Sequence, residues 1–346
     1  MSDPEQFICR HVREMHGYVP GEQPRVPGLV KLNTNENPYP PSPRVMEVFR
    51  TFAESRARLY PDPVSTELRG LIARRVGCST AQVFAGNGSD ETLALCTRAF
   101  VEDDGTIGYF DPSYSLYPIL AAIRHATVQP VPLAPDYAWN MPAGYRASFF
   151  YLTNPNAPTS MLFPKDRIRE FCASFPGVVL IDEAYADFSR ENCMDLACSM
   201  DNVLVSRSFS KSYSLAGLRV GYVVGHEKLI AALFTLKDSY NINALTQAAA
   251  FAAFDDEAHM KANVAKVLRT RERVAAELAR RGYHVYPSET NFLWVRPPQP
   301  AASVFQHLRD RKVLIRYFPG EKTGDCLRVT IGTDEQMDAF LAALPS

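Results

Sequence analysis

Short apolar runs alternate with helix-like stretches along the middle of the chain. The apolar runs are 106–110, 127–131, 148–152, 178–181, 203–206 and 219–224, and the helix-like stretches between and before them are 66–76, 89–100, 115–124 and 165–174. Short apolar runs between helices are typical of buried parallel strands. The pattern therefore predicts an α/β fold of three layers, with a mostly parallel sheet between two layers of helices.

The pattern changes after Gly225. A long amphipathic stretch is followed by alternating strand-like and helical pieces, which together predict a smaller α+β domain. The stretch is 256–281, the strand-like pieces are 283–286, 291–295, 313–317 and 326–331, and the helical pieces are 302–311 and 334–344. The first 44 residues are rich in Pro, Gly and Asn, which indicates an extended arm. We expect an arm (1–44) that packs with the small domain or a partner subunit, a large domain (45–245) and a small C-terminal domain (246–346).

Composition narrows the class of protein. The chain has 346 residues, of which 46% are apolar and 22% charged, as in globular proteins with a sizeable core. Its formal net charge is −1 and it has no basic block, so nucleic acid and anionic membranes are not expected partners. No secretory signal opens the sequence and no run of ~18 apolar residues follows, which favours the cytoplasm. The seven scattered cysteines include no Cys-x-x-Cys pair, so we expect a reduced compartment and no metal site.

The most informative stretch for chemistry is 208–219, SFSKSYSLAGLR. It places Lys211 among serines that include Ser208 and Ser210, with Arg219 eight residues further on. A lysine that reacts through its amine usually does so as a Schiff base, and hydroxyls with an arginine suit a phosphate. Pyridoxal phosphate carries both an aldehyde and a phosphate. A solvated lysine in a serine-rich loop is the alternative interpretation.

A second candidate anion site precedes the helix-like stretch at 89–100. The segment 86–91 reads GNGSDE, and its small residues leave the backbone N–H groups of Gly88, Ser89 and Asp90 free to hold an anion at a helix start. A simple helix N-cap at Ser89 or Asp90 is the alternative. A third glycine would fall at Glu91 and is absent, so a dinucleotide fingerprint is disfavoured.

Three further candidates follow predicted strands, where open α/β sheets place their ligands. Tyr114 could stack on a flat ring, or simply pack on the sheet. The amide of Asn154 lies in a turn stiffened by prolines and could face a ligand oxygen. Asp182 ends an apolar strand, where its carboxylate needs a cationic partner such as a pyridinium nitrogen. A helix-capping role for Asp182 remains the alternative.

These motifs occur together in one known superfamily. Asn154-Pro155-x-x-Pro158-Thr159, Asp182-x-x-Tyr185 and Ser208-x-Ser210-Lys211 with Arg219 resemble the fold-type-I pyridoxal-phosphate enzymes of the aspartate aminotransferase superfamily. More narrowly, the segments 32–39 (LNTNENPY), 60–63 (YPDP), 86–91 and 215–222 (LAGLRVGY) resemble the histidinol-phosphate aminotransferase family. The likeness covers nearly the whole chain. The turn NPNAPTS (154–160) and Asp334 depart from the usual family pattern, which bears lightly on the substrate.

The resemblance implies a role for each matching residue. Lys211 would form the Schiff base, and Asp182 would pair with the pyridine nitrogen. Tyr185 and Asn154 would hydrogen-bond the ring oxygen, and Tyr114 would stack on the ring. The implied phosphate ligands are Gly88, Ser89, Asp90, Ser208, Ser210, Arg219 and, from the neighbouring subunit of a homodimer, Tyr60. The implied substrate-binding residues are Tyr18, Asn37, Asn154, Arg316 and Arg328, with Arg328 on a carboxylate and with Arg316 and Tyr18 on a phosphate.

The activity implied by the resemblance is a two-stage amino transfer in histidine biosynthesis. Glutamate and imidazole-acetol phosphate would give 2-oxoglutarate and histidinol phosphate, with the Lys211 amine moving the proton as general base and then acid. Alternatives of the same fold are an aromatic or other amino-acid aminotransferase and a phosphothreonine decarboxylase. A cofactor-binding regulator without catalysis is a remote alternative.

Overall fold

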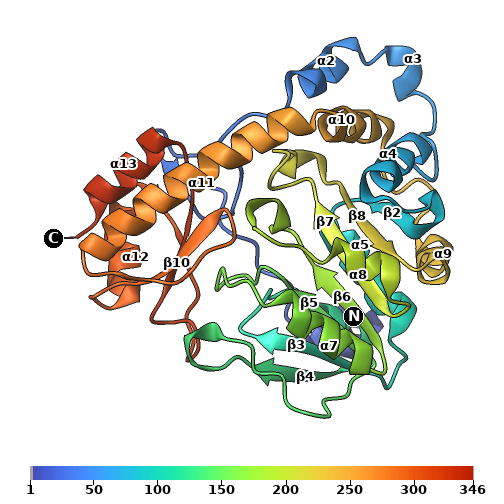
Figure 1. The fold of residues 1–346 in the computed structure, drawn as a ribbon, viewed down its shortest axis with the longest axis horizontal. Coiled ribbons are helices and arrows are strands. Elements are labelled where there is room, and N and C mark those ends of the chain that lie inside the picture. Colours follow the sequence, from blue (N-terminus) through green and yellow to red (C-terminus); the bar gives the residue numbers. More distant parts are fainter. Residues whose placement is uncertain (1–2, 346) are drawn as a thin grey trace.

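A seven-stranded sheet forms the centre of the molecule (Figure 1). The structure is a computed structural model and describes residues 3–345. The strand order is β2-β8-β7-β6-β5-β3-β4. The strands are β2 (Val83–Gly86), β3 (Thr106–Asp111), β4 (Thr127–Pro132), β5 (Phe149–Thr153), β6 (Val178–Asp182), β7 (Val203–Ser208) and β8 (Gly221–Gly225). Each apolar run expected from the sequence forms a strand of this sheet, and β2 is an additional one.

Strands β3 to β7 pair in parallel, as expected, but β8 does not. β8 is antiparallel to both β7 and β2, so the prediction that the run 219–224 is a parallel strand was wrong. A parallel neighbour needs a crossover connection, usually with a helix. The segment between β7 and β8 contains only a short 3-10 turn, η5 (Ala216–Leu218), so the chain returns beside β7 in the opposite direction.

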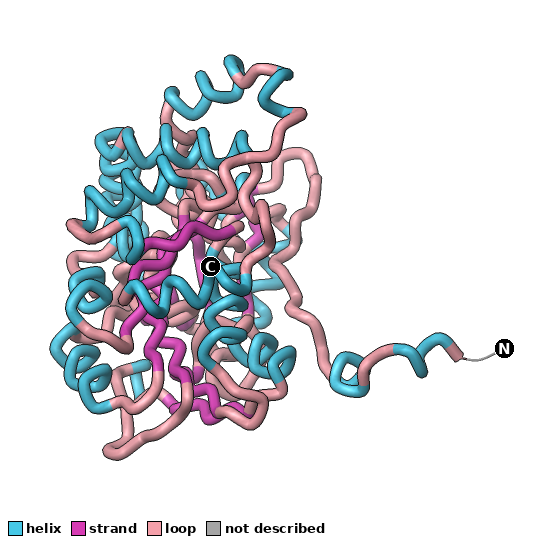
Figure 2. The backbone as a smooth tube through the Cα atoms, turned by 90° about the vertical axis from the view of Figure 1, so that its right-hand side faces the viewer, coloured by secondary structure: helices cyan, strands magenta, loops and turns pink. Residues whose placement is uncertain are grey.

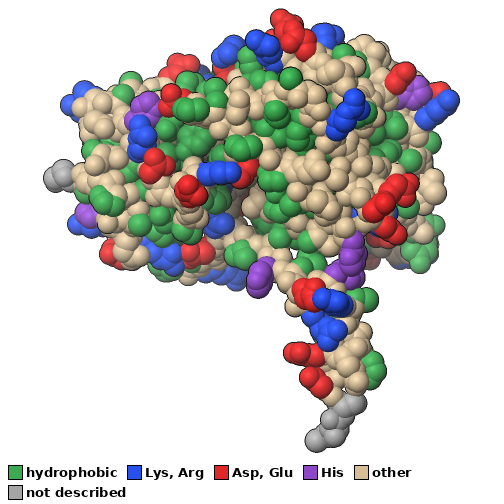
Figure 3. Space-filling view, turned by 90° about the horizontal axis from the view of Figure 1, so that it is seen from below, with side chains coloured by type: hydrophobic (Ala, Val, Ile, Leu, Met, Phe, Trp, Pro, Cys, Tyr) green, Lys and Arg blue, Asp and Glu red, His purple; other side chains and the backbone are tan. Residues whose placement is uncertain are grey.

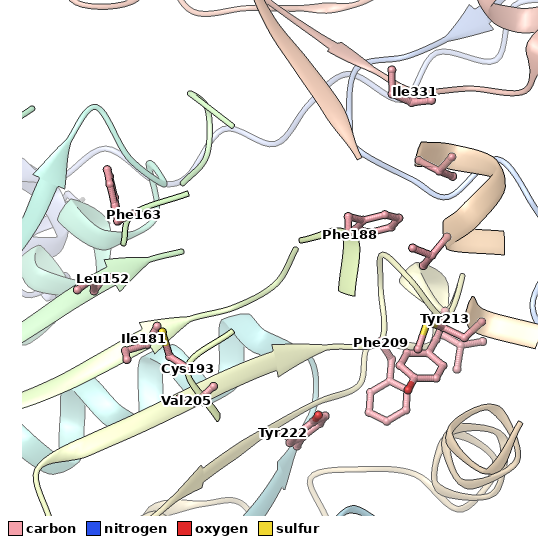
Figure 4. Close-up of a cluster of buried hydrophobic side chains, with 14 of the residues drawn as sticks. Leu152, Phe163, Ile181, Phe188, Cys193, Val205, Phe209, Tyr213, Tyr222 and Ile331 are labelled. Atoms are coloured by element: carbon pink, nitrogen blue, oxygen red, sulfur yellow. The ribbon is translucent and has the colours of Figure 1, made fainter. Parts of the chain in front are cut away.

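Helices cover both faces of this sheet, because its strands bury side chains on both sides. On β5, Phe149 and Tyr151 pack into one core, and Phe150 and Leu152 into the other. The first core is covered by α5 (Ser89–Phe100), α6 (Tyr117–Arg124) and α9 (Glu227–Leu236), and the second by α4 (Thr66–Val76), α7 (Lys165–Ser174) and α8 (Met194–Ser199). Figure 4 shows Leu152 and side chains of the neighbouring strands in the second core. The three-layer α/β architecture is confirmed.

A second, antiparallel sheet is formed by the C-terminal part of the chain. Its strand order is β12-β13-β10-β9. The strands are β9 (His284–Val285), β10 (Phe292–Arg296), β12 (Arg316–Tyr317) and β13 (Leu327–Thr330), and the helices of this part are α11 (Glu257–Arg280), α12 (Ala301–Asp310) and α13 (Asp334–Ala343). The expected strand 313–317 is broken at Ile315, and its first half, β11 (Val313–Leu314), pairs with the N-terminal strand β1 (Val30–Lys31). The domain boundaries at 44/45 and 245/246 stay predictions.

The remaining elements lie at the edge of the molecule. Helices α2 (Pro43–Thr51) and α3 (Glu54–Ala57) pack on α10 (Ala244–Asp255). At the N-terminus, η1 (Pro4–Phe7) projects away from the body, as Figures 2 and 3 show, and α1 (Arg10–Glu14) contacts α6 at the base of this projection. Among residues 3–345, no helix is both long and apolar enough to cross a membrane, and no three His, Cys, Asp or Glu side chains are grouped to hold a metal ion.

Candidate active site

A cavity of about 950 Å³ lies where the carboxyl ends of the parallel strands meet the second sheet. Asp111 of β3, Thr153 of β5, Asp182 of β6 and Ser208 of β7 all line it. The predicted site residues that line the cavity are Tyr18, Ser89, Asp90, Tyr114, Asp182, Tyr185, Ser208, Ser210, Lys211, Arg219, Arg316 and Arg328. Residues that are up to 310 positions apart in sequence are thus brought to one place, at the edge where open α/β sheets bind ligands.

Asp182 is a buried carboxylate without a cationic partner. Its side chain ends β6 and the residue is 4% exposed. Oδ2 accepts a hydrogen bond from the Tyr117 hydroxyl (3.0 Å), and Oδ1 accepts one from the Ala184 N–H (3.2 Å). Burial raises the pKa of Asp182 to about 6, although both hydrogen bonds lower it. An unpaired buried anion of this kind fits a protonated ring nitrogen, which would supply the missing positive charge.

Lys211 reaches the same cavity from the loop after β7. Its Nζ lies 3.3 Å from the Thr34 carbonyl oxygen and 5.8 Å from the centre of the Tyr185 ring. Asn37 holds the backbone of this loop, because its Nδ2 donates to the carbonyl oxygens of Lys211 (3.0 Å) and Ser212 (3.2 Å). The backbone at Lys211 is therefore fixed from outside the cavity, while the amine is directed into it.

An anion cradle lies at the start of α5. The Arg219 guanidinium donates to Asp90 Oδ2 (3.1 Å) and Ser210 Oγ (3.4 Å), close to the first N–H groups of the helix. Gly88 caps this helix with φ +85°, and a Cβ there would come within 2.7 Å of Arg219 Nη2. Backbone N–H groups, serine hydroxyls and a guanidinium around one space fit a phosphate group.

Two arginines face the cavity from the second sheet. Arg316 and Arg328 are directly opposite each other on β12 and β13. Both guanidinium groups lie against the ring of Phe318, at 5.1 Å and 5.2 Å from its centre. Arg328 Nη2 donates to the Asn33 carbonyl oxygen (2.8 Å), whereas its buried Nε has no hydrogen-bond partner. Burial and the neighbouring Arg316 lower the pKa of Arg328. Two adjacent cations with an unused donor fit a carboxylate or phosphate ligand.

Aromatic rings form one wall of the cavity. The Tyr114 ring lies edge-on to Tyr18 (5.9 Å between centres) and to Tyr117 (5.7 Å), and its hydroxyl donates to Asp90 Oδ1 (3.2 Å). Tyr114 is therefore held between the anion cradle and Tyr117, the hydrogen-bond partner of Asp182, on the wall of the cavity.

Four predicted site residues do not line the cavity. Gly88 and Asn37 act on the backbone around it, as described above. Asn154 is 2% exposed and its Oδ1 accepts a hydrogen bond from the Phe163 N–H (2.8 Å), so the amide oxygen stabilises the following turn. A contact of its NH2 group with a ligand oxygen stays a prediction. Tyr60 is 81% exposed and stacks on Tyr240 (4.4 Å between centres), outside the cavity of its own subunit.

Several contacting residues were not predicted. Tyr117 begins α6, three positions after Tyr114, which lies before the helix, so helical spacing does not relate the two. Asn35, whose Nδ2 donates to the Tyr185 hydroxyl (2.9 Å), and Phe318 also gave no local signal, because their positions depend on contacts between distant segments.

The similarities to known proteins agree with this geometry. Residues 27–344 match the family described as Aminotransferase class I and II. A histidinol-phosphate aminotransferase of Geobacter sp. (strain M21) is 42% identical over 340 residues, which are 97% of each chain. The crystal structure of histidinol-phosphate aminotransferase from Sinorhizobium meliloti in complex with pyridoxal-5'-phosphate superimposes with a TM-score of 0.83 at 26% identity, covering 91% of this chain and 89% of that one.

The fold is also shared with enzymes of another activity. L-threonine-O-3-phosphate decarboxylase from Porphyromonas gingivalis superimposes with a TM-score of 0.79 at 22% identity, covering 91% of this chain and 98% of that one. That likeness concerns the fold alone, since one fold hosts several reactions. The match over residues 27–344 and the 42% identity to a full-length relative decide the family: this chain belongs to the class I and II aminotransferases.

Proposed function

We propose that this aminotransferase uses pyridoxal phosphate bound to Lys211 and interconverts histidinol phosphate and imidazole-acetol phosphate, with glutamate and 2-oxoglutarate as the other pair. The main support for this proposal is that Lys211, the Asp182 carboxylate, which has no cationic partner, and the Arg219 cradle all lie around one cavity. The 42% identity to a histidinol-phosphate aminotransferase supports the choice of substrate. The cofactor, when bound, supplies an aldehyde that condenses with amines and a ring that accepts electrons.

The chain's own residues would hold this cofactor at three points. The N–H groups of Ser89 and Asp90, the hydroxyls of Ser208 and Ser210, and Arg219 would bind the phosphate. Asp182 would keep a proton on the ring nitrogen, because an ionised buried carboxylate is stabilised by a cation next to it. Tyr114 would lie against the ring, and Tyr185, held by Asn35, would contact the ring oxygen.

Lys211 would move the proton of the reaction. Its amine lies between the Thr34 carbonyl and the Tyr185 ring, so it is fixed inside the cavity rather than in solvent. Once an incoming amino substrate has displaced it, the free amine would take the proton from the substrate α-carbon as a general base and deliver it to the cofactor's aldehyde carbon as a general acid. The backbone contacts of Asn37 keep the amine in place between these steps.

The arginine pair would select the substrates. Histidinol phosphate carries a phosphate and glutamate carries carboxylates, so one site must accept both kinds of oxyanion in alternate half-reactions. Arg316 and Arg328, adjacent on β12 and β13, would provide it, with Tyr18 beside them in the cavity. A guanidinium binds either anion through two parallel hydrogen bonds.

A homodimer would complete the site. Tyr60 is exposed and does not line the cavity of its own chain, which leaves it available to the phosphate of a second subunit. Mixed dimers of Lys211→Ala and Tyr60→Ala chains test this: one of their two sites would contain neither substitution and regain activity. Hybrids as inactive as their parents would contradict a shared site.

The cytoplasmic location expected from the sequence also stays a prediction.

The proposed activity is tested by following the visible absorbance of the purified, cofactor-loaded protein during half-reactions. We expect the band to be lost with histidinol phosphate and with glutamate, and to be unaffected by phenylalanine. Lys211→Ala is the control, because no amino donor should cause loss of the band at a catalytic rate in this variant. Carbon dioxide released from phosphothreonine would instead identify a decarboxylase, and reaction with phenylalanine alone would identify an aromatic aminotransferase.

A further inference from the structure

A buried network of charges lies directly behind the site. Arg207 of β7 donates from Nε to Glu183 Oε2 (2.7 Å) and from Nη1 to Asp187 Oδ1 (2.9 Å). The side chains of Arg207, Glu183 and Asp187 are only 11%, 0% and 24% exposed. The other carboxylate oxygen of Glu183 accepts the Cys193 N–H, so this oxygen also has its donor.

The network reaches the catalytic lysine through Ser212. The Ser212 hydroxyl donates to Asp187 Oδ2, and Ser212 is 2% exposed and adjacent to Lys211 in sequence. Asp187 itself forms part of the 3-10 turn η4 (Ala186–Phe188) that follows Tyr185. Every oxygen of the two carboxylates is thus used, and the last one holds the peptide next to Lys211.

Three members of the network lie one or two positions after a residue that lines the cavity. Glu183 follows Asp182, Asp187 lies two positions after Tyr185, and Ser212 follows Lys211. These residues lie in two segments, the end of β6 with η4 and the end of β7 with the loop after it, and hydrogen bonds from Arg207 and Ser212 connect the two. Asn37 holds the carbonyl oxygens of Lys211 and Ser212 on another side, so this peptide is held by two independent sets of hydrogen bonds.

Stability alone does not account for such a network. Burying three charges is costly, and well-packed apolar side chains of similar size often stabilise a fold equally well. What apolar packing lacks is direction: hydrogen bonds between charged groups fix the relative positions of the segments that carry them. Proton transfer by Lys211 depends on such positions, because small displacements of a reacting group reduce rates strongly.

We propose that Ser212, acting through Asp187 and Arg207, is a positioning residue that sets where the Lys211 amine lies relative to Asp182 and Tyr185. The inference rests on the proposed function, in which Lys211 carries the cofactor. It assigns no contact with substrate or cofactor to Ser212, whose hydroxyl is turned to Asp187.

The test compares Ser212→Ala with Ser214→Ala. Ser214 lies in the same loop and has a buried hydroxyl without a hydrogen-bond partner, so its loss removes an atom but no interaction. We expect Ser212→Ala to lower kcat about tenfold with little change in KM, and Ser214→Ala to change neither. Asp187→Asn should also lower kcat. Adding Ser212→Ala to Asp187→Asn should lower kcat by less than the tenfold expected for Ser212→Ala in the wild type, because both substitutions break the same hydrogen bond.

A second readout needs no cofactor. Competitive acetylation of the cofactor-free protein at several pH values, read by mass spectrometry, reports the reactivity and pKa of Lys211. Ser212→Ala should change the Lys211 acetylation profile more than twofold, while Ser214→Ala and the acetylation of exposed lysines stay as in the wild type. The thermal unfolding of both variants is measured to confirm that they fold.

The outcomes separate the two proposals. If wild-type protein carries the cofactor on Lys211 but Ser212→Ala matches Ser214→Ala in kcat and acetylation, the positioning role is overturned and the proposed function stands. If KM rises and kcat is unchanged, Ser212 acts on substrate binding and the inference is also wrong. If wild-type protein never carries the cofactor on Lys211, the proposed function itself fails.

Discussion

The hydroxyl of Tyr117 donates a 3.0 Å hydrogen bond to Oδ2 of Asp182, and both residues are buried, although only Asp182 lines the cavity. The Tyr117 ring is stacked on Tyr151, at 4.2 Å between centres, so the donor cannot easily turn away. Burial raises the pKa of a carboxyl group, and a hydrogen bond donated to its ionised form opposes this rise. Tyr117 therefore maintains the negative charge with which Asp182 would hold a cationic ring nitrogen.

Replacing Tyr117 by phenylalanine should weaken cofactor binding and turnover. The variant loses one hydrogen bond to a charged group, which costs about 1.5–3 kcal/mol, or roughly tenfold to 100-fold in cofactor affinity. Titration of cofactor-free protein with pyridoxal phosphate measures this. Tyr283→Phe is the matched control, because the Tyr283 hydroxyl is buried without a partner. Equal affinities in the two variants would show that Tyr117 has no such role.

Asp182 should make the stability of the cofactor-free protein depend on pH. Its pKa is raised from 3.8 to about 6 by burial, so between these values the folded state binds more protons than the unfolded state. The contribution of Asp182 to the free energy of unfolding therefore falls by about 3 kcal/mol as the pH rises from about 4 to about 6. Asp182→Asn cannot titrate and should gain stability relative to wild type over that range. Chemical denaturation at each pH would contradict the account if the difference stayed constant or changed in the opposite direction.

Alanine substitution of either cavity arginine of the second sheet should raise KM, whereas the same substitution of an exposed arginine nearby should not. Removing the half-buried Arg328 by Arg328→Ala should raise KM for glutamate and for histidinol phosphate, each by about 100-fold, since a buried charge pair is lost. Arg316→Ala should affect histidinol phosphate more than glutamate. Arg296→Ala is the control, because Arg296 is exposed on β10 and pairs with Asp325. Steady-state kinetics with both substrates measure these effects, and an Arg328→Ala enzyme with unchanged KM values would refute the assignment.

Gly88 should be required for the anion cradle rather than for folding. Gly88→Ala combines strain at φ +85° with a Cβ only 2.7 Å from Arg219 Nη2, so Arg219 must move away from the cradle. Gly77→Ala also places a side chain at positive φ, but in the left-handed region (φ +80°, ψ 33°), whereas Gly88 has ψ 166°. Nothing lies within 4 Å of a Cβ at Gly77. Gly77→Ala should lose about 1 kcal/mol of stability from strain. Gly88→Ala should lose more, about 1–3 kcal/mol, because its backbone conformation is nearly confined to glycine, and only Gly88→Ala should also lose cofactor affinity. A comparable loss of affinity in Gly77→Ala would point to a general effect on folding.

The sequence predicted those features that local patterns determine. Runs of apolar residues identified the strands from β3 to β7. Lys211 and Arg219 were singled out by the chemistry of the stretch 208–219, and Asp182 because it ends an apolar strand at the edge where open sheets bind ligands. The resemblance to a known family added Arg316 and Arg328, which periodicity alone does not distinguish from other charged strand residues.

What could not be predicted depends on contacts between distant segments. The direction of β8 is set by the short connection from β7, which no apolar pattern reports. The orientation of the Asn154 amide depends on the turn that ends at Phe163. Likewise, Asn35 meets Tyr185 across 150 positions, and Arg207 meets both of its acidic partners in the segment after β6. Such pairings are fixed by packing, so they become visible only in the folded chain.

The central claim is that the amine of Lys211 carries pyridoxal phosphate. It is tested most directly by incubating the protein with that compound, reducing it with borohydride, digesting it and locating the added mass by mass spectrometry. The account predicts a single modified peptide that contains Lys211, and none in Lys211→Ala. A protein that stays unmodified, or whose modification is on other lysines, would contradict it.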